Sequence, residues 1–311
     1  MPTFSVLIET ILIFLALMLV GYLAARKGVL DGGFSRGASF LVMNLFLVAA
    51  ILRSVTSESV TLSGAALGHV MFILTVTALL IYLLAFAALK LFEPKLGDPA
   101  MTEVLFNLPN IMFVCLPILQ EIYGPAAALY VALSGLPCNF LIYTYSVWRL
   151  NAMRADGSKA AGLRLRDIFS PCLISAFLAF VILMLKPPVP HPIRHFLDLA
   201  APAATPLSML IIGVTMGSTE LLSAFREKRV YLVSLIRLVL APLLVWLVLR
   251  PLTDDALLLK TCVVIAGAPC GILTTVLALQ YGHDALLCSR SVVVTTLLSM
   301  ITLPCILYLL G

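Results

Sequence analysis

Apolar stretches of helix length alternate with short polar connections along the whole chain of 311 residues. A helix needs roughly 20 predominantly apolar residues to cross the hydrocarbon core of a bilayer. The pattern therefore predicts an all-α polytopic membrane protein with ten transmembrane helices, at about 4–25, 34–53, 64–91, 100–121, 125–148, 168–186, 197–218, 229–249, 256–280 and 287–310.

The longest polar connection is a basic linker at 151–167, which divides the chain into two repeats, 1–150 and 168–311, each with five predicted helices. Because five is an odd number, the second repeat enters the membrane in the opposite sense to the first. Such an inverted-topology repeat is the plan of many secondary transporters.

The fourth helices of the two repeats share a short sequence pattern. "PNIMFVCLPILQ" (109–120) and "PCGILTTVLALQ" (269–280) match at three of twelve positions, and "YG" follows both. Chance among apolar residues would explain three identities alone, but the equivalent place of the two helices in their repeats favours a true repeat.

Both of these helices contain residues that interrupt a helix near its middle. Pro109 lacks a backbone donor and clashes with the preceding turn, and the second helix carries Gly267 and Pro269. In lipid, the freed backbone groups must be satisfied by protein or by water in a cavity. We therefore expect helices 4 and 9 to be broken and to cross at these positions. An ordinary proline kink is the alternative for either helix alone.

Each break would expose the N-terminus of a second half-helix, at about 110–121 and 270–280. Free N–H groups and the helix dipole favour an anion there. The candidate substrate-binding residues at the crossing are Asn107, Asn110, Cys270, Gly271 and Thr274.

Only 11% of the residues are charged, and the basic ones are distributed unequally between the two sides. Loops after odd-numbered helices hold fourteen Lys and Arg residues and the other loops hold five, which predicts a cytoplasmic linker and both termini outside. The net charge of +5 therefore reports topology and contact with the inner leaflet, not nucleic-acid binding. The first apolar run has no basic region before it, so we interpret it as an uncleaved transmembrane helix.

Metal and cofactor chemistry find no support in the sequence. The seven cysteines form no CxxC pair and are typical of small buried hydrophobic residues, and the four histidines are scattered. We expect no metal site and no cofactor.

Several segments resemble the auxin efflux carrier family, whose bacterial members are associated with small organic acids. They are "GYLAARKGVLDGGFSRGASFLVMNLFL" (21–47), "PNIMFVCLPIL" (109–119), "AATPLSMLIIGVTM" (203–216), "APCGILTTVLALQYG" (268–282) and "TLLSMITLP" (296–304). The resemblance implies ten helices, crossing helices 4 and 9, and a scaffold domain distinct from a transport domain. It makes Asn110 the asparagine after the first crossover proline and Pro269 the second crossover proline.

The chain departs from the family pattern in two places. Met112 and Cys115 stand where the family often has glycines after the first crossover proline, and Val48 stands where its second helix often has proline. Asn44 of that helix remains, so we include it among the candidate substrate-binding residues.

Charged residues inside predicted spans are functional candidates by default. Glu103 is the candidate for proton or cation coupling, with a carboxylate at the cytoplasmic interface as the alternative. For Arg237 we favour snorkelling to the inner interface over pairing with a substrate carboxylate. We expect Arg290 to be a surface anchor. No pair of acidic residues occupies the centre of a span, which argues against a dedicated sodium/proton antiporter.

The sequence thus predicts a secondary transporter of a small organic anion in the bacterial inner membrane, working by alternating access. The substrate would be a carboxylate such as malate, malonate or an auxin-like acid, held at the crossing. A sodium-coupled symporter of the bile-acid type shares this architecture and is the main alternative, with the coupling ion, proton or sodium, left open. Apolar faces on helices 2 and 7 offer either a homodimer interface or a surface for lipid.

Other protein classes fit less well. A membrane-embedded enzyme such as an acyltransferase needs a general base with a partner, and the nearest pair is His195 with Asp198, which we interpret as a helix-start interaction. A receptor usually carries a soluble output domain, and no segment is long enough for one. We therefore expect no enzymatic activity.

Overall fold

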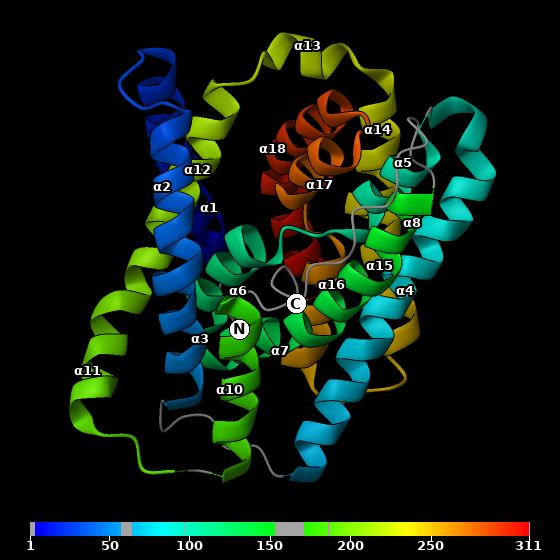
Figure 1. The fold of residues 1–311 in the computed structure, drawn as a ribbon. Coiled ribbons are helices and arrows are strands. Elements are labelled where there is room, and N and C mark those ends of the chain that lie inside the picture. Colours follow the sequence, from blue (N-terminus) through cyan, green and yellow to red (C-terminus); the bar gives the residue numbers. More distant parts are fainter. Residues whose placement is uncertain (1–3, 57–63, 97, 153–170, 186, 311) are drawn as a thin grey trace.

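The computed structural model describes residues 4–56, 64–96, 98–152, 171–185 and 187–310 (Figure 1). The predicted linker 151–167 lies, except for its first two residues, outside the described residues. Within them the chain is helical, and the one extended pairing is an isolated antiparallel bridge between Pro109 and Cys270.

The first half of the chain forms helices that are interrupted by short π-helical turns, labelled η. They are α1 (Phe4–Arg26), α2 (Gly32–Leu41), η1 (Val42–Phe46), α3 (Leu47–Thr56), α4 (Gly64–Leu96), α5 (Pro99–Asn107), η2 (Ile111–Cys115), α6 (Leu116–Tyr123), α7 (Pro125–Leu141), η3 (Ile142–Ser146) and α8 (Val147–Ala152).

The second half begins with α10 and ends with α18 near the C-terminus. Its elements are α10 (Pro171–Leu185), α11 (His191–Ala200), the 3₁₀ turn η4 (Ala201–Ala203), α12 (Ala204–Gly217), α13 (Leu221–Arg226), α14 (Lys228–Leu235), the π turn η5 (Ile236–Leu240), α15 (Ala241–Leu249), α16 (Ala256–Ala266), α17 (Leu273–Tyr281) and α18 (Ala285–Leu309).

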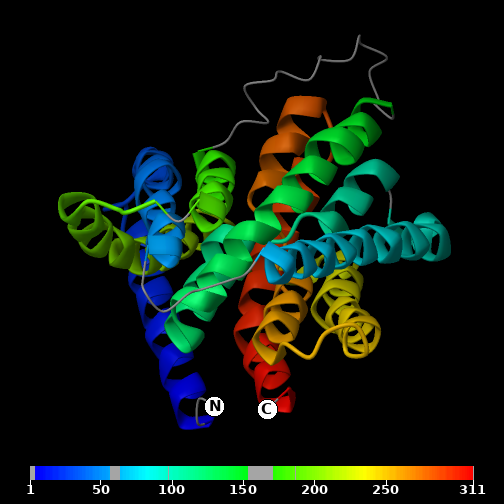
Figure 2. The ribbon, with the colours of Figure 1, turned by 90° about the horizontal axis from the view of Figure 1, so that it is seen from below.

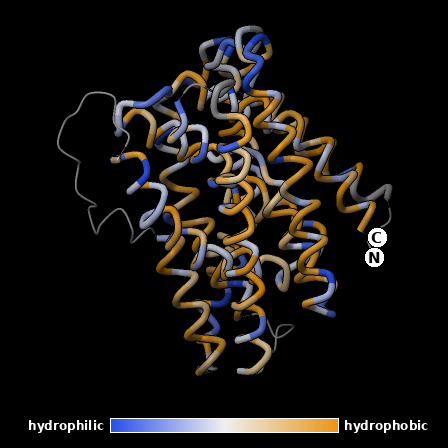
Figure 3. Tube along the Cα trace, turned by 90° about the vertical axis from the view of Figure 1, so that its right-hand side faces the viewer, coloured by the Kyte–Doolittle hydropathy of each residue, from blue (hydrophilic) through white to orange (hydrophobic). Residues whose placement is uncertain are grey.

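Seven helical stretches among the described residues are long and apolar enough to cross a membrane. They coincide with seven of the ten predicted spans, and Figure 3 shows hydrophobic residues along most of their length. The prediction of an all-helical polytopic membrane protein is therefore confirmed. The other three predicted spans differ for a visible reason: α10 has only 15 residues, and the predicted helices at 100–121 and 256–280 are each divided by a break.

The helices pack as two groups. The first group contains α1, α2, α3, α10, α11 and α12, and the second contains α4, α5, α8 and α13 to α18, with α7 packed against helices of both (Figure 1). The start of α1 and the end of α18 lie on the same side of the molecule (Figure 2).

Contact between α1 and α12 is unusually close at Gly213. A Cβ atom added to this glycine would lie 2.0 Å from the carbonyl oxygen of Met18, far inside van der Waals contact. Only a residue without a side chain allows the two backbones to approach this far. The first group of helices is therefore built around a tightly packed, rigid pair.

Candidate functional site

The two broken helices meet at their breaks. The backbone N–H of Asn110 donates to the carbonyl of Pro269 at 2.9 Å, and the N–H of Gly271 donates to the carbonyl of Leu108 at 2.8 Å. A Cβ atom on Gly271 would lie 3.3 Å from the carbonyl oxygens of Leu108 and Pro109, so glycine suits this close approach. Backbone groups that each proline break leaves without a helical partner thus bond across the crossing.

Arg237 lies immediately behind the crossing, in the π turn η5. Arg237 is only 1% exposed. Its Nε donates to the carbonyl of Ala268 at 2.8 Å, and its Nη1 donates to the carbonyl of Phe106. The prediction that Arg237 snorkels to the inner interface is therefore wrong. The side chain is held inside the protein because it satisfies carbonyl groups at the ends of α5 and α16.

Three residues on the second side of the crossing already have partners in the protein. Thr295 accepts the N–H of Cys270 at 3.0 Å, and the Cys270 thiol donates to the carbonyl of Leu105. The hydroxyl of Thr274 donates to the carbonyl of Gly271 at 2.7 Å. In this conformation, Cys270, Gly271 and Thr274 shape the crossing rather than present free groups.

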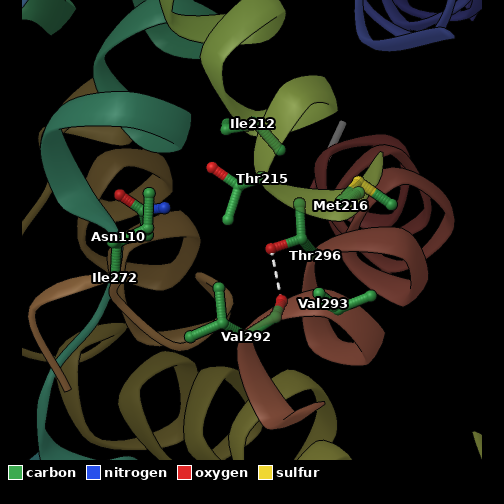
Figure 4. A pocket seen from close by; sticks show the side chains of 8 residues that line it. All are labelled: Asn110, Ile212, Thr215, Met216, Ile272, Val292, Val293 and Thr296. Atoms are coloured by element: carbon green, nitrogen blue, oxygen red, sulfur yellow. Dashed lines mark hydrogen bonds between the residues drawn. The ribbon is translucent and has the colours of Figure 1, made fainter. Parts of the chain in front are cut away.

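Asn110 faces a small cavity between the crossing and helices α12 and α18. Figure 4 shows its amide pointing into this space, on the opposite side from Thr215 and Thr296. The buried Nδ2 of Asn110 has no hydrogen-bond partner among the described residues, whereas both threonine hydroxyls donate to carbonyls of their own helices. The amide N–H groups of Asn110 are therefore the free donors of this cavity.

The cavity holds about 10 Å³, close to what a single water molecule requires. A dicarboxylate does not fit in that volume. Besides Asn110 and the two threonines, its lining is apolar and consists of Ile212, Met216, Ile272, Val292 and Val293. The structure therefore represents a closed conformation at this position.

Asn107 is also buried next to the break, with 2% of its surface exposed. Neither its Oδ1 nor its Nδ2 has a hydrogen-bond partner among the described residues. An amide without partners in a membrane interior is unfavourable, so this side chain is a strong candidate for contact with water or a ligand in another conformation.

Asn44 has a different environment. Its side chain is exposed on η1 and its Nδ2 donates to the carbonyl of Phe40 on the same helix at 2.7 Å. It does not line the Asn110 cavity. The structure thus does not bring Asn44 together with the crossing residues.

Glu103 is fully buried in the second group of helices and has two partners from one neighbouring helix. Its carboxylate accepts hydrogen bonds from Arg149 Nε at 2.8 Å and from the Tyr145 hydroxyl. The carboxylate is thus part of a buried ion pair within the protein. Tyr145 and Arg149 are four residues apart, so they lie on one face of their helix and clamp the carboxylate together.

Further polar contacts join the ends of helices near this ion pair. His283 Nδ1 lies 2.7 Å from an Asp98 oxygen, and its Nε2 lies 3.0 Å from the carbonyl of Leu150. Arg290, the predicted surface anchor, lies 3.6 Å from Glu227, which also accepts from Arg229. The hydrogen bond from Arg229 is the main cause that lowers the pKa of Glu227.

Asp198 on α11 pairs with Arg53 on α3 at 2.7 Å. The predicted helix-start interaction between Asp198 and His195 is therefore wrong, and His195 stacks on His191 instead. Close to this pair, a second cavity of about 320 Å³ lies between α3, η4 and α12 on one side and α6 and α7 on the other. Its lining includes Arg53, Gln120 and Thr205.

No group of three metal-ligating side chains occurs among the residues that the structure describes. The pairs Asp98–His283 and Glu103–Arg149 were not predicted from the sequence, because their members lie 185 and 46 residues apart. Their signal in the sequence was a set of ionisable residues near the ends of apolar stretches.

Comparison with known proteins adds a family and several relatives. A family model described as "Membrane transport protein" matches residues 6–307. A protein of Rhizobium meliloti named "Putative malonate transporter" is 29% identical over 96% of this chain and 94% of its own length. The uncharacterized transporter MJ1031 of Methanocaldococcus jannaschii is 24% identical over 95% of this chain and 96% of its own length. The uncharacterized transporter YfdV of Escherichia coli is 23% identical over 66% of this chain and 67% of its own length.

Proposed function

Since this chain belongs to the membrane transport protein family, the auxin efflux carrier family that its sequence resembles, we propose that it carries a small organic anion across the bacterial inner membrane by alternating access. The family and the relatives make it a membrane transporter and not an enzyme. The relative's name supports malonate, or a carboxylate of similar size, as the substrate.

The observation that carries the proposal is the free amide of Asn110 at the start of a half-helix. The first helical bond after the break comes from Val114, so the N–H groups of Ile111, Met112 and Phe113 have no acceptor within their own helix. These groups and the Asn110 Nδ2 would hold a carboxylate, because donors at a helix N-terminus and its dipole favour negative charge. Asn107 would join them once the cavity widens.

We assign the two groups of helices to the two bodies that alternating access requires. The first group, with its tight α1–α12 pair, would be the scaffold domain, and the second, with the crossing, would be the transport domain. The ten helices would form an inverted repeat of five and five, with both termini outside. The cavity of about 320 Å³ between the first group and the helices α6 and α7 would then be the entrance from the outer side.

The proposal is tested with the purified protein in liposomes and radiolabelled malonate, with malate and a monocarboxylate in parallel. We expect saturable uptake that Asn110→Ala reduces at least tenfold while the thermal unfolding midpoint stays unchanged. Asn44→Ala is the matched control, because it removes an amide that bonds only within its own helix. Normal uptake by Asn110→Ala, or loss of uptake in Asn44→Ala alone, would sink this assignment.

A further inference from the structure

Arg237 places a positive charge at the point where two helix ends meet. Its two bonded donors reach the carbonyls of Phe106 and Ala268, at the C-terminal ends of α5 and α16. A helix C-terminus carries a partial negative charge of roughly half an elementary charge. Two such ends that converge in a membrane interior form a site that favours a cation. In transporters with broken helices, carbonyls of this kind coordinate the coupling cation.

No carboxylate balances this charge among the described residues. None of the salt bridges in that part of the chain involves Arg237, and Glu103 is bound to Arg149 instead. The guanidinium is therefore compensated by backbone dipoles, as a bound metal cation would be.

We propose that Arg237 is a tethered cation that takes the position of a coupling ion at the crossing, so that carboxylate movement does not require sodium. The carbonyls that a sodium ion would need are already occupied by Nε and Nη1. The charge moves with the transport domain and attracts anions from either side. As a statement about transport, this inference rests on the proposed function; as a statement about the crossing, it stands on the two carbonyl contacts.

The wild-type protein gives the first test. Uptake of labelled malonate is expected to be the same within experimental error in sodium, potassium and N-methylglucamine salts of equal ionic strength. The thermal unfolding midpoint in detergent is expected to be equal in sodium and potassium chloride. A selective rise of either quantity with sodium overturns the inference.

The second test removes the tethered charge. Arg237→Ala leaves the carbonyls of Phe106 and Ala268 without their donors and leaves space beside them. We expect its unfolding midpoint to fall by several degrees, and millimolar guanidinium to restore part of this loss. Arg36→Ala, which removes an exposed arginine on α2, is the matched control and is expected to show no such response. The absence of a selective guanidinium effect on folded Arg237→Ala overturns the inference.

A third variant guards against failure of Arg237→Ala to fold. Arg237→Lys keeps the charge and is expected to keep uptake independent of sodium, with a lower rate because lysine cannot reproduce the two-carbonyl geometry. Sodium-dependent uptake by Arg237→Lys would contradict the inference. If the wild type accumulates no carboxylate at all, the proposed substrate class fails, and the midpoint measurements still decide the role of Arg237.

Discussion

The clamp on Glu103 gives the sharpest test of whether this residue couples ions or stabilises the fold. Glu103→Gln keeps the size of the side chain and removes its charge. The Glu103 side chain is 1% exposed and Arg149 is 24% exposed. Hydrogen bonds to charged groups contribute about 1.5–3 kcal/mol each, and breaking a buried ion pair costs about 3–5 kcal/mol.

Partial exposure of Arg149 reduces this cost, because the guanidinium left behind can turn toward water or lipid head groups. We therefore expect a loss of about 2 kcal/mol, which corresponds to a roughly 30-fold change in the unfolding equilibrium. A double-mutant cycle with Arg149→Gln checks the magnitude: the double variant is expected to be about as stable as Glu103→Gln alone.

The assay combines unfolding in a mild detergent with uptake in liposomes across the pH range 5 to 8. For a structural clamp, Glu103→Gln lowers stability and leaves the shape of the pH profile of uptake unchanged. For a coupling residue, the variant has wild-type stability and uptake that no longer responds to a pH gradient. The second result would refute the structural interpretation of the ion pair.

Three further predictions concern the packing at Gly213, the hydrogen bond between Arg229 and Glu227, and the membrane topology. Gly213→Ala is expected to lower stability by about 1–3 kcal/mol in a thermal unfolding assay, because its Cβ would lie 2.0 Å from the carbonyl oxygen of Met18. Gly37→Ala is the control and is expected to be neutral or stabilising, because nothing lies within 4 Å of its added Cβ. The hydrogen bond from Arg229 is the main cause that lowers the pKa of Glu227, so Glu227 contributes stability above its unfolded pKa and loses it as the pH falls through the folded value. The difference in unfolding midpoint between wild type and Glu227→Gln is expected at pH 7 and is expected to shrink as the pH is lowered through the range in which this carboxylate takes up its proton. A phosphatase fused to the C-terminus is expected to be active, and an inactive fusion would contradict the assignment of both termini to the outer side.

Local sequence rules located the interruptions better than the contacts around them. Proline and glycine act on their own backbone, so the ends of α5 and α16 follow from Pro109, Gly267 and Pro269 with little tertiary information. That the two breaks bond to each other depends on how distant segments pack. The sequence supplied only a weak repeat as a guide to that pairing.

The role of Arg237 was mispredicted because it depends on which way one side chain points. Its distance from the helix end suggested a reach to the inner interface, but the π turn Ile236–Leu240 shifts the register of side chains at this point. A π turn has no reliable sequence signature. The same limit applies to Asn44, which the family pattern placed with the site and which the structure shows on an exposed face within η1.

The hydrogen bonds that join the two breaks also constrain how the chain is made. Asn110 enters the membrane long before Pro269, whose carbonyl its backbone needs, has been synthesised. At 5–20 residues per second the interval is roughly 8–32 s, in which the first broken helix has no partner for its exposed N–H. The nascent first half must therefore be sheltered, by the insertion machinery or by water at the membrane surface, until the ninth helix arrives. A chain that stops before Pro269 would keep that defect permanently and become a substrate for membrane proteases.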